Sequence, residues 1–115
     1  MAKYTATLSA QNTNVKVCQI VQPRAFPSWF ANVMASGTFG GGTVTFGISF
    51  DGGTTIYPLT QDGVGTAASL TALGAVNIRC GSSNTQTATT EVPYLYASIG
   101  AATSPSVTII ALDNR

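Results

Sequence analysis

Histidine is absent from this sequence, and charged residues make up only 8% of it. Histidine is the commonest general base and the commonest transition-metal ligand, so both kinds of site lack their usual residue. Only four carboxylates remain, Asp51, Asp62, Glu91 and Asp113. Nothing in their spacing selects the pair of acids on which a glycosidase depends. We therefore expect a protein that is not an enzyme and that holds neither a metal nor a cofactor.

Asp51 and Asp62 each precede a glycine, in segments that resemble turns. A turn aspartate ordinarily bonds its own backbone, and this is our interpretation of both residues. The alternative is a calcium site made of the two side chains and nearby carbonyls, but the spacing matches no calcium-binding loop. The three glycines at 40–42 are followed by neither Lys-Ser/Thr nor a helical pattern, so they indicate a turn rather than a phosphate loop.

Long apolar runs and clusters of charge are also missing. No apolar segment approaches the roughly 20 residues that a membrane helix needs, and residues 1–5 lack the apolar centre of a signal peptide. The five basic residues are scattered and are offset by four acidic ones, which is unlike a nucleic-acid-binding surface. We expect a protein that binds neither membrane nor nucleic acid.

Cysteine occurs only at positions 18 and 80. Both residues lie in predicted strands among apolar neighbours, where a reduced cysteine behaves as a small hydrophobic residue. Neither belongs to a Cys-x-x-Cys pair, which argues against zinc and redox roles. The sequence favours two reduced, buried thiols, and the alternative is a disulfide in an exported domain.

The shortage of charged residues indicates whether the protein acts alone or bound to a partner. Soluble proteins carry about 25% charged residues, whereas this surface must be made polar mainly by Thr, Ser, Asn, Gln and Gly. Such a surface is covered by a partner with little desolvation of charge. This composition predicts a chain that works inside an assembly. The alternative is a secreted domain with a neutral, hydroxyl-rich surface.

The sequence does contain the alternation of apolar and polar residues that is typical of β-strands. Residues 43–50 alternate strictly, with Val44, Phe46, Ile48 and Phe50 on one face. A glycine-rich turn then leads to a short return strand at 56–59, where proline argues for a sheet edge. Further strands are predicted at 3–9, 15–21, 29–35, 75–80, 92–99 and 107–112.

About eight strands in 115 residues predict an all-β fold. We expect a single domain over 1–115, an antiparallel two-sheet sandwich resembling a jelly roll. The strand at 29–35 is apolar on both faces and is predicted to be central and buried. Residues 63–71 are expected to hold a helical turn, and residues 81–90 an exposed loop.

Aromatic residues supply the candidate contacts. Core packing is the commoner role of such residues; the alternatives are a sugar-binding platform and, for the tyrosines, interface anchors. The polar chain ends beside strands are candidates for adding to a neighbour's sheet edge. The candidate partner-contact residues are Lys3, Tyr4, Trp29, Tyr57, Tyr94, Tyr96 and Arg115.

Two thirds of the chain resembles a pattern found in small structural proteins of tailed bacteriophages. Residues 37–44 match Gly-x-Phe-Gly-Gly-x-Thr-Val, and residues 51–55 match the Asp-Gly-Gly-Thr-Thr that follows it. Residues 70–74 match Leu-Thr-x-x-Gly, and residues 100–108 match the closing Gly-Ala strand with Ser-Pro-Ser-Val-Thr. Ile56 stands where the pattern often has tryptophan, and residues 1–34 match no part of it.

These phage proteins include capsid decoration (cement) proteins as well as fibre and neck components. The resemblance implies a virion protein made in the host bacterial cytoplasm, and we expect a decoration protein on the capsid surface. Its partner would be the major capsid protein or another virion protein, bound by a dimer or trimer of this chain. The alternatives are a tail, neck or head-fibre component and a carbohydrate-binding sandwich module.

Overall fold

The computed structural model describes residues 2–21, 29–62, 64–80 and 93–114, and these residues form strands and turns. No helix of the length and hydropathy that a membrane span requires occurs in this described part. The strands are β1 (Ala2–Leu8), β2 (Val15–Gln19), β3 (Trp29–Thr38), β4 (Thr43–Ser49), β5 (Tyr57–Pro58), β6 (Ser69–Leu70), β7 (Gly74–Cys80), β8 (Tyr94–Gly100) and β9 (Ser106–Asp113).

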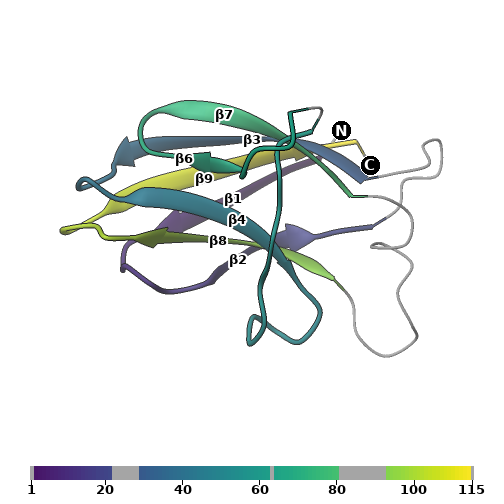
Figure 1. Ribbon diagram of the computed structural model, residues 1–115, viewed down its shortest axis with the longest axis horizontal. Helices are drawn as coiled ribbons and strands as arrows, with labels where there is room; N and C mark the ends of the chain where they lie inside the picture. The colour runs from purple at the N-terminus through teal and green to yellow at the C-terminus, as the bar shows by residue number, and fades with distance from the viewer. Residues whose placement is uncertain (1, 22–28, 63, 81–92, 115) are drawn as a thin grey trace.

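The strands form two antiparallel sheets, which Figure 1 shows as two stacked layers. Sheet A has the order β1-β9-β3-β7, and sheet B has the order β2-β8-β4-β5, with the short β6 also paired to β4. Strands β1 to β4 alternate between the sheets, and β7 to β9 do the same. With β6 set aside, this is the strand order of a jelly roll. The predicted all-β sandwich is confirmed, with one more short strand than expected.

The core lies between the sheets and follows the period-two pattern. The alternation predicted for β4 is confirmed, because Val44, Phe46 and Ile48 are buried and Phe50 packs partly against them. The predicted return strand is reduced to β5, which lies at the edge of sheet B and ends at Pro58. The largest fully buried apolar side chains are Trp29, Leu8, Ile20, Ile78, Leu95, Ile99, Ile109, Val33, Val44 and Val107.

The strand predicted at 29–35 is central but is not buried on both faces. It is part of β3, which pairs with β9 on one side and β7 on the other. Trp29, Ala31 and Val33 are buried, whereas Phe30 and Met34 are only partly so. The prediction of a doubly buried strand was wrong because a two-layer sandwich has no third layer over its outer faces.

The helical turn predicted at 63–71 was also wrong over its described part, 64–71, which contains β6. Leu70 and Ser69 pair with β4, and the Phe46 amide donates to the Ala68 carbonyl at 3.2 Å. Ala68 is buried against the core, so sheet pairing overrides the local helical preference of its alanines. The loop predicted at 81–90 lies outside the described residues.

Cys18 and Cys80 are both buried and form no disulfide, as the sequence predicts. Cys18 belongs to β2, at one edge of sheet B, and Cys80 belongs to β7, at one edge of sheet A. Strand β2 packs against β1 while β7 packs against β6, so the two cysteines lie at opposite edges of the sandwich. Burial raises the pKa of the Cys80 thiol to about 11.

Candidate partner interface

The candidate contact residues do not gather at one place. Tyr57 is 56% exposed, and its ring meets Phe50 edge-on with 6.3 Å between centroids. Tyr94 is half-buried, with the Lys16 ammonium 4.3 Å from its ring centre. Lys3 is exposed at the opposite side of the molecule, on sheet A. Arg115 lies outside the described residues.

Trp29 and Tyr4 point into the sandwich. Trp29 is fully buried, and its indole Nε1 donates a hydrogen bond of 3.0 Å to Oδ2 of Asp113. Tyr4 shares the inner face of β1 with Leu8 and packs against the core. Trp29 is therefore not available as a surface contact, because position 29 falls on the inward half of the β3 alternation. For this residue the core interpretation is the correct one.

Tyr96 is also covered, although it points outward from sheet B. It lies opposite Gly47 in the sheet, and only 4% of it is exposed. The hairpin after β4 folds over it: a Cβ on Gly53 would contact the Tyr96 ring, and the Asn14 side-chain amide holds the Gly53 carbonyl at 3.3 Å. Because Trp29 and Tyr96 are covered, the sugar-binding platform predicted from Trp29, Tyr57, Tyr94 and Tyr96 does not form.

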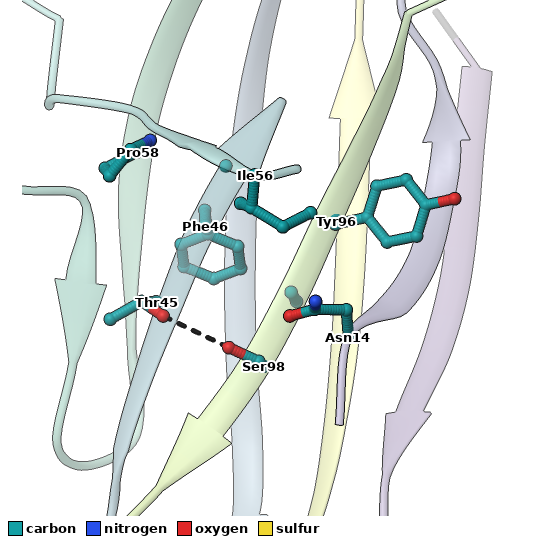
Figure 2. A pocket seen from close by; sticks show the side chains of 9 residues that line it. Asn14, Thr45, Phe46, Ile56, Pro58, Tyr96 and Ser98 are labelled. Carbon is teal, nitrogen blue, oxygen red and sulfur yellow. Dashed lines mark hydrogen bonds between the residues drawn. The ribbon is translucent and has the colours of Figure 1, made fainter. Parts of the chain in front are cut away.

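Beside Tyr96 lies a small hollow on the outer face of sheet B (Figure 2). The Thr45 and Ser98 hydroxyls, 3.3 Å apart, lie on one side of it, and Ile56 and Pro58 on the other. Its volume is about 160 Å³, whereas sites for small molecules are about 300 Å³ or larger. All of its lining side chains are uncharged. The hollow has neither the size nor the electrostatics of a cofactor site.

The two turn aspartates have separate structural roles. Oδ1 of Asp51 accepts hydrogen bonds from the Thr55 amide at 2.9 Å and from the Ser49 hydroxyl at 2.8 Å. The Thr55 amide and the Ser49 hydroxyl lower the pKa of this carboxyl below its ordinary 3.8. The turn role predicted for Asp51 is confirmed.

The carboxylate of Asp62 has a different partner. Its Oδ1 accepts from the Arg79 Nε at 3.2 Å, and its backbone amide donates to the Asn77 carbonyl at 2.7 Å. The prediction that the Asp62 side chain bonds its own turn was therefore wrong. The side chain instead links the loop after β5 to the edge strand β7. No group of three His, Cys, Asp or Glu side chains that would suit a metal occurs in the described ranges.

The main feature that the sequence interpretation missed is the outer face of sheet A. Directly opposed residues of a ladder point the same way, so the register places Met34 beside Ile110 and Asn32 beside Leu112. The apolar side chains of Phe30, Met34, Ile110 and Leu112 form a partly exposed centre on β3 and β9. The outer A face comprises Lys3, Thr5, Thr7, Phe30, Asn32, Met34, Ser36, Ala75, Asn77, Arg79, Thr108, Ile110 and Leu112.

Charge occurs only at the two edges of the outer A face. Lys3 lies on β1, and Arg79 lies on β7. Arg79 is paired with Asp62, and its guanidinium lies 5.8 Å from the Phe30 ring centre. The sequence did carry a signal for this apolar centre, because residues 29–35 and 107–112 are largely apolar at both odd-numbered and even-numbered positions. In a two-layer fold only one of these two sets can face the core, so the other faces outward.

No family model matches the chain, and no curated protein matches it either.

Proposed function

We propose that this chain is a capsid decoration protein of a tailed bacteriophage, a non-enzymatic component that binds the assembled head and stabilises it. The observation that carries the proposal is the outer A face, which is apolar at its centre and nearly free of charge. The sequence resemblance to phage structural proteins supplies the kind of partner. The jelly-roll order is in keeping with this use, since viral capsid domains employ it, although lectins do as well.

The size of the outer A face suits a contact that is repeated many times. Four strands about 4.8 Å apart and about seven residues long at 3.4 Å per residue cover roughly 450 Å². This is the area of the whole face, and its apolar centre of Phe30, Met34, Ile110 and Leu112 is a smaller part of it. A full specific interface covers about 800 Å² on each partner, so one copy binds modestly. A shell offers the same contact at every equivalent position.

The stabilisation follows from mass action. A protein that binds the assembled shell and not its free subunits stabilises the shell by RT ln(1 + [L]/Kd) for each site. Covering the outer A face desolvates little charge, because only Lys3 and the Arg79–Asp62 pair are ionic there. The favourable term is then burial of Phe30, Met34, Ile110 and Leu112, at about 25 cal/mol per Å² of apolar area.

The test is to mix purified protein with phage heads assembled without it, then to measure co-sedimentation and thermal rupture. We expect binding to many positions per head and a higher rupture temperature. Ile110→Lys should abolish binding, because it places a charge in the centre of the outer A face. The matched control is Thr45→Lys, an exposed strand position on sheet B, which should bind normally.

Two other outcomes select other functions. Binding of only a few copies, confined to the tail vertex, would replace the proposal with a neck or tail role. If the protein does not co-sediment with heads but is retained on a polysaccharide column, and Tyr57→Ala abolishes this retention, the function is that of a carbohydrate-binding module. Tyr57 is the position to change because it is the most exposed aromatic ring among the described residues.

A further inference from the structure

The four edges of the two sheets are not equally protected against pairing with another strand. An unprotected edge strand presents a row of N–H and C=O groups to any neighbouring strand. In sheet B, β2 carries a bulge between Lys16 and Cys18, and β5 is only two residues long and ends in Pro58. Bulges, short edge strands and prolines are devices that block edge pairing.

In sheet A, the edge at β7 is covered by the loop that follows β5. The Asp62 amide donates to the Asn77 carbonyl, and the Asp62 carboxylate pairs with Arg79. Among the described residues, the edge at β1 has neither a bulge nor a proline nor a covering loop, and the charge of Lys3 is its one protecting feature. Strand β1 pairs with β9 over all seven of its residues without a bulge, contains no proline, and has a single charge at Lys3.

We infer that β1 pairs antiparallel with β1 of a second copy, about a twofold axis at Thr5. This register opposes Ala2 with Leu8, Lys3 with Thr7, Tyr4 with Ala6, and Thr5 with its own symmetry mate, so the whole strand is used. Thr–Thr pairs are favourable neighbours across a ladder. The inner residues of both copies stay on one side, so the two sandwiches join without turning an apolar face outward.

The charges of the strand are compatible with this pairing. The two Lys3 residues are four positions apart along the joined strands, about 14 Å. This separation exceeds the Debye length of about 8 Å at physiological ionic strength. Pairing through either neighbouring symmetric register, about Tyr4 or Ala6, leaves one end of β1 without a partner.

Dimerisation would also enlarge the surface proposed to bind the head, and this part of the inference rests on the proposed function. The joined sheet has the order β7-β3-β9-β1-β1-β9-β3-β7, and its two outer A faces form one continuous surface. That surface covers about 900 Å², twice the estimate for one copy. It reaches the roughly 800 Å² that a specific interface needs on each partner.

The test is sedimentation equilibrium of the whole protein, with Thr5 as the variable position. Wild type should approach twice the 11.8 kDa chain mass as its concentration rises. Thr5→Lys and Thr5→Glu should each weaken the dimer at least about tenfold, because each places like charges opposite one another at the axis. An equimolar mixture of the two variants should recover the dimer, now as a heterodimer.

The control is Ala75→Lys, an exposed position on β7 at the far edge of sheet A, which should dimerise as wild type does. Circular dichroism and a thermal melt check that every variant is folded. A monomeric wild type at several hundred micromolar, or a dimer indifferent to Thr5→Lys, would overturn the inference. Shells are not used in this test, so its failure leaves head binding to be decided by co-sedimentation.

Discussion

The Trp29 indole donates a 3.0 Å hydrogen bond to the carboxylate of Asp113, and both residues are fully buried. They are 84 positions apart in the sequence. One is the first residue of β3 and the other is the last residue of β9. The bond therefore joins two neighbouring strands at one end of sheet A, the end at which both chain termini lie in Figure 1.

Removing the acceptor should destabilise the fold. We expect Asp113→Ala to lower the free energy of unfolding by about 1–3 kcal/mol, because it leaves the buried indole N–H without its acceptor. Asp113→Asn keeps an oxygen for the indole and should cost less than the alanine variant. Urea unfolding followed by tryptophan fluorescence measures both. Equal stabilities for Asp113→Ala and wild type would contradict a structural role for this bond.

The turn after β4 should show a specific dependence on pH. The Asp51 carboxyl has a lowered pKa because it accepts from the Thr55 amide and the Ser49 hydroxyl. Its contribution to stability is thus present above the ordinary value of 3.8 and is lost as pH falls through the lower folded value. Asp51→Asn should be less stable than wild type at neutral pH, and the difference should shrink in acid. NMR titration of the carboxyl reports the pKa directly.

Gly47 is required for the hairpin to lie across sheet B. A Cβ at this position would collide with Cγ2 of Ile56. We expect Gly47→Ala to cost about 1–3 kcal/mol, as overpacking does, and to raise the exposure of Tyr96. Gly100 is the matched control, because a Cβ there meets only the Asn12 side-chain oxygen at 3.4 Å. Gly100→Ala should stay within about 0.5 kcal/mol of wild type in the same urea titration.

The two thiols should be slow to react in the native protein. Cys80 is fully buried, and its pKa is raised to about 11, so almost no thiolate is present at neutral pH. The thiolate is the reactive form. Alkylation without reductant should modify neither cysteine rapidly under native conditions and both after denaturation. A mass showing an intact disulfide in the denatured protein would contradict the structure.

The strands and the layered fold were predictable because they depend on local pattern. The alternation of β4 at Val44, Phe46 and Ile48 is a period-two signal within seven residues. The same kind of signal located the strands that became β1 and β7. The turn role of Asp51 was predictable for a similar reason, since its acceptor lies within four positions of its donors.

The candidate site was much less predictable, because exposure depends on what covers a residue. Tyr96 and Tyr57 are both tyrosines in strands of sheet B. A hairpin covers the outward-pointing Tyr96, whereas Tyr57, which lies opposite the inward Ile48 at the edge of the sheet, is 56% exposed. Trp29 was a candidate contact by residue type, but its parity in β3 turns it inward. Residue type gives a preference for burial, and only the fold decides whether that preference is met.

The sequence by itself determined that this chain builds a charge-poor, two-layer β-sandwich with two reduced cysteines. Periodicity, turn residues and composition are properties of short segments, so they can be read without knowing which strands meet. Only the tertiary structure decided that β9 lies between β1 and β3, which assembles the outer A face. It also left β1 as the least protected edge among the described strands. Pairing of this kind joins residues up to 111 positions apart, such as Ala2 and Asp113, and no local pattern encodes such a partner.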